Sequence, residues 1–436
     1  MDNWSTLTNI LGSPVFQGIG VAVALFGALF TALFFFFPAF KTAVQHAGHR
    51  VLHSRYFGYV FGGVVLFLTG AGTVLFTGVE LPKMGVDATW PPESGILAAV
   101  ENRGKLRCGV HGGLPRFSQI TDAGNTTGFD ADFCRVIAVA IFGEYESRVD
   151  FVRLNVEDRF SALEEGKVDV LVRNTTWTVG RDVTQNLDFG PPIFYDGQAF
   201  LVRDASGIEE LADLRDKEIC VLPNTTTIQN LLAVFEERGI KFRAVTKEED
   251  GTPFESNENV FGAYALGRCD AVTSDQSQLI ARQPDLSNPS EHDFIRDDEG
   301  VVVISKEPLA PLFVSGDEQW REVITYAVYA TIQAAELDIH RENILMKRNV
   351  PEVPIKAFLG IDDSDIQEHI GQSIGLPNDF ALKIVERVGN YDEIYQRNLG
   401  DLIPERGPNQ TWTKGGLLIS PPFNSAPPRV VSSQTP

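Results

Sequence analysis

The hydrophobic and polar positions divide the chain into two unlike parts. Nothing between Asn3 and Phe40 carries a charge, and a second uncharged run extends from Tyr56 to Val79. Each run exceeds the ~20 residues that a membrane-spanning helix needs. We therefore predict an extracytoplasmic N-terminal tail at 1–17, transmembrane helices at 18–40 and 57–80, a cytoplasmic loop at 41–56 and a linker at 81–94.

The loop at 41–56 sets the expected orientation of the two helices. It holds Lys41, Arg50 and Arg55 and no acidic residue. Since positive charge near membrane ends stays on the cytoplasmic side, the large C-terminal part should lie outside the cytoplasm, at the inner (plasma) membrane. The N-terminus carries Asp2 and no basic residue, which argues against a cleaved signal peptide.

After the second run, short apolar stretches alternate with amphipathic ones. Strands alternating with helices predict an α/β fold around mostly parallel sheets. No apolar run of membrane-spanning length follows Val79, which excludes a channel pore or a multi-span permease within this part of the chain. The expected strands are 105–110, 148–154, 168–172, 217–222 and 269–274, and the expected helices include 131–142, 156–165 and 226–238.

Composition narrows the classes of partner. The formal net charge is −21, with 37 basic and 58 acidic residues. Such an acidic balance argues against binding nucleic acid or anionic lipid headgroups, which both need a basic surface. The tail at 409–436 is rich in Pro, Gly and Ser, and we expect it to wrap the surface or to be disordered.

The cysteines predict disulfides and not a metal site. All four lie in the part expected outside the cytoplasm, where disulfides persist, and three pairings are possible. The positions of the cysteines on the predicted strands and helices favour pairing within the first half and within the second half of the extracytoplasmic part. Cys108 would then pair with Cys134, and Cys220 with Cys269. No Cys-x-x-Cys pair is present, and the loop histidines lack acidic or thiol neighbours, so no metal or cofactor is predicted. Those histidines are His46, His49 and His53.

Residues 173–182 combine hydroxyl groups with a guanidinium directly after an apolar strand. Thr176 and Thr178 alternate along this stretch, and Arg181 follows. Hydroxyls and a planar fork of N–H donors suit a carboxylate held in bidentate fashion. A Thr-rich helix N-cap followed by a surface salt bridge between Arg181 and Asp182 is the alternative, and this stretch alone leaves both open.

Several other segments gather Gly-rich turns, helix starts and polar strand ends. They lie at 108–118, 128–134, 158–169, 221–227 and 267–277, followed by 305–309, 388–391 and 412–416. In this order they resemble the periplasmic amino-acid-binding proteins of ABC importers, most of all the general L-amino-acid-binding branch, over about residues 95–420. The resemblance implies a two-lobed, type II periplasmic-binding-protein-like fold with a hinge. Lobe 1 is expected at 95–199, lobe 2 at 200–300, and a return to lobe 1 with C-terminal helices at 301–408.

The resemblance also implies a role for single residues. Arg181 matches the arginine that holds the ligand α-carboxylate, and Asp275 matches the carboxylate that binds the α-ammonium group. Thr226 matches a threonine at a helix N-terminus, where free N–H groups favour an anion. The other matches are Asn174 and Thr176, which contact both ligand groups, and Phe117, which lines the ligand side chain.

Each assignment has a structural alternative. Thr226 and Asp275 would serve equally as helix caps, and Phe117 as a core aromatic. Arg159 and Arg173 lie near the predicted cleft, where they either accept an acidic ligand side chain or pair with Asp158 or Asp182. The family usually has glycine where this chain has Asn224, a residue that tolerates the left-handed backbone of such a turn.

The predicted function is that of a membrane-tethered binder that passes L-amino acids to the permease of an ABC importer. We expect it to bind many different amino acids. A preference for polar or acidic amino acids is a hypothesis. A sensing subunit of a signalling complex is the first alternative. A dehydratase or lyase on the same fold is the second, and His111 is the only histidine near the expected cleft to act as an acid or base.

Overall fold

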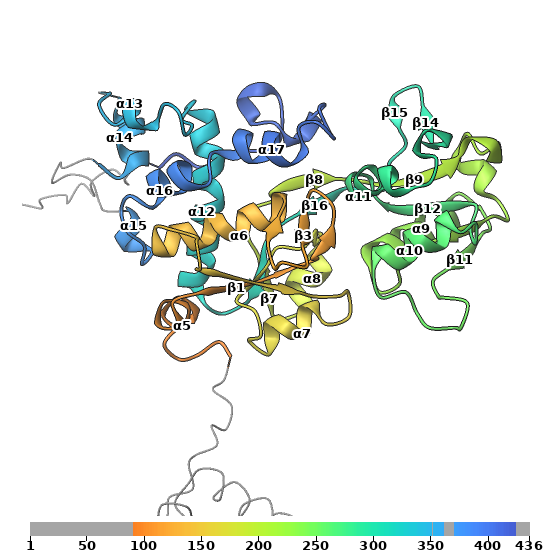
Figure 1. Ribbon diagram of the computed structural model, residues 1–436, viewed down its shortest axis with the longest axis horizontal. Coiled ribbons are helices and arrows are strands. Elements are labelled where there is room, and N and C mark those ends of the chain that lie inside the picture. The colour runs from red at the N-terminus through yellow and green to blue at the C-terminus, as the bar shows by residue number, and fades with distance from the viewer. Residues whose placement is uncertain (1–89, 351, 362–369, 424–436) are drawn as a thin grey trace, which may run out of the picture. The chain divides into compact units, whose positions relative to one another are not determined.

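The computed structural model describes residues 90–350, 352–361 and 370–423, within one compact unit of the chain at 88–436. Two five-stranded sheets form the centres of two α/β lobes (Figure 1). The first sheet has the order β5-β1-β6-β17-β7 and the second the order β11-β10-β12-β9-β13. Their strands are β1 Leu106–Val110, β5 Val149–Arg153, β6 Val170–Leu171, β7 Leu187–Phe189 and β17 Leu312–Val314, and then β9 Gln198–Arg203, β10 Glu218–Cys220, β11 Arg243–Val245, β12 Ala271–Asp275 and β13 His292–Phe294.

Both sheets are mixed, which corrects the expectation of mostly parallel pairing. In the first sheet β1 runs parallel to β5 and β6, whereas β17 is antiparallel to β6 and β7. In the second, β10 is parallel to β11 and β12, whereas β9 is antiparallel to β12 and β13. A parallel neighbour needs a long crossover, usually a helix. β9 and β17 enter their sheets directly from the strands that link the lobes, so this constraint does not apply to them.

Two antiparallel strands link the lobes. β8 (Phe194–Asp196) leads into β9 of the second sheet, and β16 (Glu307–Leu309) leads into β17 of the first. They pair with Glu307 opposite Asp196, and Figure 1 shows them side by side between the two lobes. Because both crossings lie together, the lobes can move about this pair of strands as about a hinge.

Helices cover the sheets and add a C-terminal layer to the first lobe. The core of that lobe forms where α12 packs on α6 and α16, because these helices turn aliphatic and aromatic side chains toward one another. The helices of the first lobe are α5 Ile96–Arg103, α6 Phe129–Phe142, α7 Arg159–Glu164, α8 Val179–Thr184, α12 Glu318–Glu336, α13 Ile344–Lys347, α14 Val353–Leu359, α15 Ile370–Ser373, α16 Phe380–Arg387 and α17 Tyr391–Leu399. Those of the second lobe are α9 Thr226–Glu237, α10 Asn257–Ala265 and α11 Gln276–Arg282.

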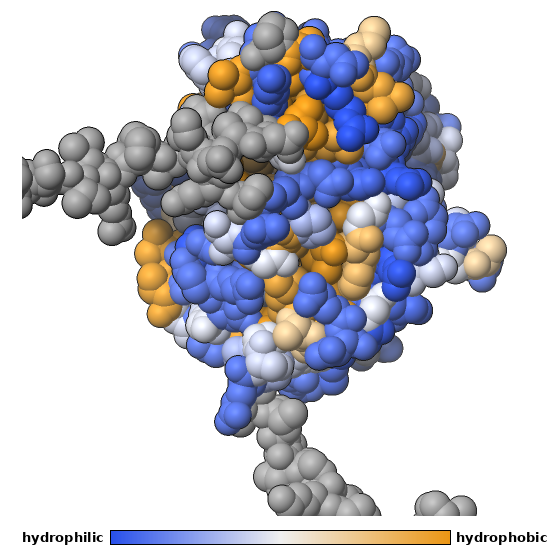
Figure 2. All heavy atoms as spheres, turned by 90° about the vertical axis from the view of Figure 1, so that its left-hand side faces the viewer, coloured by the Kyte–Doolittle hydropathy of each residue, from blue (hydrophilic) through white to orange (hydrophobic). Residues whose placement is uncertain are grey.

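Hydrophilic residues make up most of the face that Figure 2 shows. Figure 2 looks onto the side that carries α14 to α16, where hydrophobic residues show only between hydrophilic ones. Among residues 90–350, 352–361 and 370–423, no helix is both long and apolar enough to cross a bilayer. The predicted spans at 18–40 and 57–80, and the tail and loop beside them, lie outside the described residues.

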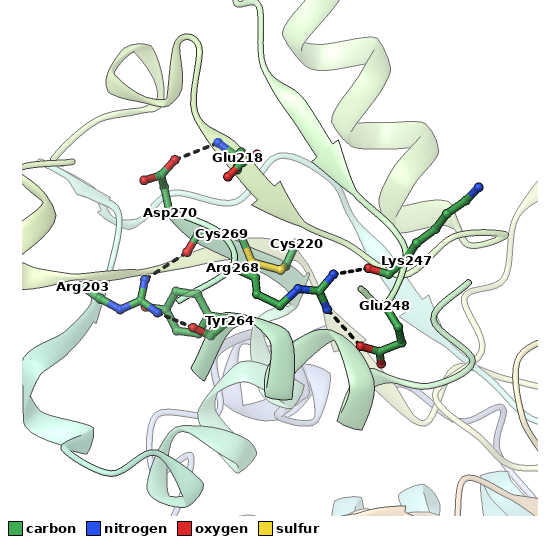
Figure 3. The surroundings of a disulfide bond; sticks show 9 residues. All are labelled: Arg203, Glu218, Cys220, Lys247, Glu248, Tyr264, Arg268, Cys269 and Asp270. Atoms are coloured by element: carbon green, nitrogen blue, oxygen red, sulfur yellow. Dashed lines mark hydrogen bonds and ion pairs between the residues drawn. A yellow bond between two sulfur atoms is a disulfide. The ribbon is translucent and has the colours of Figure 1, made fainter. Parts of the chain in front are cut away.

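Two disulfides tie strands to their neighbours, in the pairing that the sequence favoured. Cys108 of β1 bonds to Cys134 of α6, and Cys220 of β10 bonds to Cys269, just before β12. All four residues are buried. Figure 3 shows hydrogen bonds around the second disulfide. The Arg268 guanidinium donates to the Glu248 carboxylate at 3.0 Å, the Arg203 guanidinium donates to the Cys269 carbonyl oxygen, and the Asp270 carboxylate accepts from the Glu218 backbone N–H.

Removing the second disulfide should lower the free energy of unfolding by about 2–4 kcal/mol. The bond spans a sequence separation of 49 residues, and closing a long loop restricts the unfolded chain. Urea unfolding of the Cys220→Ser/Cys269→Ser variant against the unmodified protein measures this. When both proteins are unfolded under full reduction, the difference between their free energies of unfolding should disappear. A difference that persists under reduction would show that packing at the two positions, and not the disulfide, causes the loss of stability.

Candidate ligand-binding cleft

One cavity is lined by polar side chains from both lobes. They come from the ends of β1, β6, β10 and β12 and from the first turns of the helices that follow. In α/β sheets, ligands bind at the carboxyl ends of strands, and this cavity lies there. All predicted site residues except Phe117 line it. The lining residues are His111, Val156, Arg159, Arg173, Asn174, Thr176 and Arg181 from the first lobe, and Leu222, Thr225, Thr226, Thr227, Asn257, Ser274, Asp275 and Gln278 from the second.

Arg181 projects from the first turn of α8, where Thr178 caps the helix. The Thr178 hydroxyl accepts from the Arg181 backbone N–H at 3.2 Å. The guanidinium donates to the Thr176 carbonyl oxygen at 2.7 Å and lies 5.5 Å from the centre of the Phe160 ring. Burial lowers its pKa, an effect that Glu307 and Asp275 oppose. Within the described residues Arg181 forms no salt bridge with Asp182, so the surface alternative does not describe it.

Thr226 begins α9 on the opposite wall. Its hydroxyl lies 3.5 Å from the hydroxyl of Thr176, so the two lobes approach closely here. Thr225 occupies the N-cap position and makes no capping hydrogen bond through its side chain. The first turn of α9 therefore presents N–H groups toward the cavity without a side-chain cap. Asn224 in the preceding turn has φ 58°, the left-handed conformation expected there.

Asp275 ends β12 and occupies the N-cap position of α11, but its side chain makes no capping hydrogen bond. Its carboxylate accepts instead from the Gln278 side-chain amide at 2.7 Å. Burial raises the pKa of Asp275 well above its usual value, and the nearby carboxyls of Asp196 and Glu307 add to this. An arriving cation would relieve that penalty.

Glu307, on the linking strand β16, holds polar groups of both lobes. Its carboxylate accepts from the hydroxyl of Thr176 in the first lobe and from the Thr226 hydroxyl in the second, the latter at 3.3 Å. Asn230 and Ser305 donate to its other oxygen at 2.7 and 2.6 Å. The sequence placed Glu307 in a recognisable motif, but no local pattern showed that it lies against residues 131 and 81 positions away.

Two further arginines are buried in the first-lobe wall. Arg159 lies 4.6 Å from the centre of the Phe160 ring, and its Nε and Nη2 have no hydrogen-bond partner among the described residues. Burial lowers its pKa, as does the proximity of Arg173 and Arg181. Arg173 donates to the Leu154 carbonyl oxygen at 2.8 Å, and burial lowers its pKa to about 10. Neither forms an ion pair with Asp158 or Asp182, one of the two alternatives, in the described part of the chain.

Asn174 lies beside them with φ 42°, an uncommon conformation for a residue other than glycine. Both polar atoms of its buried side-chain amide lack a partner within the described residues. Buried polar groups are normally hydrogen-bonded, and strained backbone of this kind clusters at functional sites. The amide is therefore available to a ligand.

Contacts between the lobes also close the rim of the cleft, and no local sequence pattern predicted them. Arg282 of α11 donates to the Gly113 carbonyl oxygen at 2.9 Å and pairs with Glu258 at 3.1 Å. Glu258 lies 3.8 Å from Nδ1 of His111. Burial lowers the pKa of His111 to about 3, with Arg173 contributing, so its imidazole is neutral at physiological pH.

Phe117 does not line the cleft, contrary to the position that the resemblance gave it. Its ring is fully buried, with ring centres 6.1 Å from Phe129 and 5.6 Å from Phe194 in edge-to-face contacts. Aromatic rings at this spacing stabilise a core. The core alternative describes this residue, because its ring is buried against Phe129 and Phe194 and does not line the cavity.

Known proteins share this architecture. The family model "bacterial extracellular solute-binding proteins, family 3" matches residues 106–346. A general L-amino acid-binding periplasmic protein (AapJ) of Rhizobium johnstonii is 40% identical over 329 residues, 75% of this chain and 92% of the relative. The glutamate/glutamine/aspartate/asparagine-binding protein BztA of Rhodobacter capsulatus is 35% identical over 331 residues, 75% and 93% of the two chains.

A solved ABC transporter periplasmic binding protein of Brucella ovis with glutathione bound superposes with a TM-score of 0.69. It is 38% identical and covers 75% of this chain and 99% of its own. This likeness confirms the two-lobed, type II periplasmic-binding-protein-like fold. The family consists of binding proteins, which fits the prediction that the chain is not an enzyme. The chain belongs to the bacterial extracellular solute-binding proteins, family 3.

Proposed function

We propose that this protein captures an L-amino acid between its lobes, outside the cytoplasm, and delivers it to the permease of an ABC importer. One observation carries the proposal: Arg181 of the first lobe and Asp275 of the second line the same cavity. A free amino acid bears a carboxylate and an ammonium group on one carbon, the complement of this pair. Binding proteins for amino acids among its relatives support the same ligand class.

The neighbouring groups suit the same ligand. Arg181 and the first turn of α9 at Thr226 provide donors for the carboxylate. Asp275 accepts from the ammonium, and Asn174 offers an uncommitted amide to either group. Thr176 already donates its hydroxyl hydrogen to Glu307, so its oxygen is left to accept, which suits the ammonium.

Arg159 favours ligands with a second acidic group. Its unpartnered, buried N–H groups lie beside those of Arg173, and a second carboxylate would supply the missing acceptor. Glutamate, aspartate and glutathione, named for two relatives, each carry one. We propose binding across several amino acids, with acidic ones held most tightly, because Arg159 adds affinity without being needed for the backbone groups.

The predicted spans at 18–40 and 57–80, which lie in the two uncharged runs, provide the tether in this proposal. Each has the length and composition of a membrane-spanning helix. A binder so anchored would meet its permease by diffusion in the plane of the membrane. Extraction at high pH tests the tether: an anchored protein stays with the membrane pellet, and release into the supernatant would contradict it.

Calorimetric titration of the full-length protein with each common amino acid tests ligand capture directly. Binding of at least one, with glutamate or aspartate strongest, is expected. Failure of every amino acid to bind would remove the central claim. Binding of neutral amino acids alone would remove only the role of Arg159.

Amino-acid affinity should fall as the pH is lowered. The pKa of Asp275 is raised in the free protein by burial and by Asp196 and Glu307, although Arg181 and Gln278 oppose this. A bound ammonium lowers that pKa, so binding releases a proton. Between the bound and free pKa values, the dissociation constant should rise by up to about tenfold per pH unit as the pH falls.

Calorimetric titrations in buffers of different ionisation enthalpy measure the number of protons released, because the buffer takes up each proton and adds its own heat to the heat of binding. Asp275→Asn is the matched control, since it keeps the shape and removes the titrating group. The variant should bind more weakly and lose this part of the pH dependence. An unchanged pH profile in the variant would assign the effect to another group.

A further inference from the structure

A second cavity, outside the cleft, lies on the first lobe and is lined by arginines. Its volume is about 590 Å³. Five of its lining residues are arginines and one is a carboxylate, Asp132, in a protein whose formal net charge is −21. The arginines are Arg116, Arg135, Arg341, Arg387 and Arg397. None of them lines the cleft between the lobes.

Asp132 fixes two of these arginines in place. Its buried carboxylate accepts from Arg135 at 2.7 Å on one oxygen, and from Arg397 and Asn398 at 2.7 Å each on the other. Arg135 belongs to α6 and Arg397 to α17, so a single carboxylate joins two distant segments at the wall of the cavity. Donors held in this way lose little conformational entropy when a ligand binds.

The remaining arginines are less fully compensated. Arg116 pairs with the exposed Asp401 at 2.6 Å. The Arg341 guanidinium donates to the backbone carbonyl of Arg387, which is a neutral acceptor. The Arg387 side chain has no hydrogen-bond or ion-pair partner among the described residues.

Few carboxylates offset these charges. Glu393 accepts from the backbone N–H groups of Arg341 and Asn390 and does not line the cavity. Within the described part of the chain, three of the five guanidinium groups pair with a carboxylate, and they share two, Asp132 and Asp401. Like charges gathered in this way repel one another, and a bound anion would relieve the repulsion.

We propose that this cavity binds a small oxyanion that carries at least two negative charges, of which inorganic phosphate is the simplest. The planar fork of a guanidinium matches oxyanions in bidentate fashion, and several forks facing one space favour a multivalent anion over chloride. Arg341 and Arg387 supply the uncommitted charge, and Arg397, held by Asp132, supplies a fixed donor. This site is independent of amino-acid capture.

Titration of the full-length protein with inorganic phosphate tests the site, with sodium chloride at equal ionic strength as the reference. Calorimetry should detect phosphate binding, and phosphate should raise the temperature of unfolding above its value in chloride. The Arg341→Ala/Arg387→Ala variant should bind phosphate at least tenfold more weakly. Arg387→Gln, which removes a side chain without a partner to lose, should also weaken binding.

Arg296→Ala is the matched control, because Arg296 is an exposed arginine of the second lobe outside both cavities. It should bind phosphate as the unmodified protein does. The proposal is overturned if phosphate acts no differently from chloride, or if both Arg387 variants bind it with unchanged affinity. An amino-acid titration of the same samples reports on the cleft separately, so failure there would leave this result intact.

Discussion

Replacing Arg181 with methionine is expected to weaken amino-acid binding more than a hundredfold. Methionine keeps a long unbranched side chain but removes the guanidinium, which lies over the Phe160 ring, so a ligand carboxylate would be buried without its charged partner. Truncating one member of a buried, hydrogen-bonded charge pair costs about 2–5 kcal/mol, and a hundredfold loss corresponds to about 2.7 kcal/mol. Isothermal titration with the best-bound amino acid measures the effect.

The control for this variant is Arg296→Met, which removes an exposed arginine of the second lobe. Its affinity should match that of the unmodified protein. If Arg181→Met keeps its affinity within about tenfold, or about 1.4 kcal/mol, then Arg181 does not hold the ligand carboxylate. Unchanged thermal unfolding of the variant in the absence of ligand separates this outcome from misfolding.

Replacing Trp320 with alanine should lower the free energy of unfolding by about 3–5 kcal/mol. Trp320 lies fully buried in the first turn of α12, and its indole N–H donates to the Asp169 carbonyl oxygen at 3.1 Å. The change leaves a large cavity and a buried acceptor without its donor. Asp169 also pairs with Arg103 and with Arg107 of β1, so Trp320 packs against a residue that ties α5 to the first sheet.

Urea unfolding followed by circular dichroism measures this loss of stability. Trp412→Ala is the matched control, since the Trp412 side chain is 56% exposed and its removal opens no core cavity. It should change the free energy of unfolding by no more than about 0.5 kcal/mol. Similar losses in the two variants would show that burial of Trp320 is not what stabilises the first lobe.

Three of the residues predicted for the site, which line the same cavity, share one local signature. Arg181, Thr226 and Asp275 each follow a short strand and stand at or near the first turn of a helix. Such a strand-to-helix junction is visible in the order of apolar and polar residues. Its location at the carboxyl end of a strand then follows from α/β architecture. The cysteine pairs were favoured on a different ground, since each bond joins two cysteines of the same half of the extracytoplasmic part.

Phe117 shows where local pattern fails. An aromatic after a Gly-rich turn suits a pocket wall and a core equally well, because both bury the same surface. Phe117 lies in the core because its ring contacts Phe129 and Phe194. Phe194 lies on the linking strand β8, far along the chain from Phe117. The antiparallel pairing of β9 and β17 could not be predicted from local pattern for a similar reason. The direction of each strand depends on how the chain crosses from one lobe to the other through the linking strands.

The sequence by itself therefore determined the α/β class and the charged groups offered at strand ends, because these depend on short-range periodicity and spacing. It favoured the disulfide partners without excluding the other pairings. Only the tertiary structure brought Glu307 against Thr176 and Thr226, set Arg282 and Glu258 across the rim, and gathered the arginines around Asp132. Those groups lie far apart in the chain, and their interaction depends on how two lobes and a C-terminal layer of helices fold together. No periodicity of a linear sequence encodes such distances.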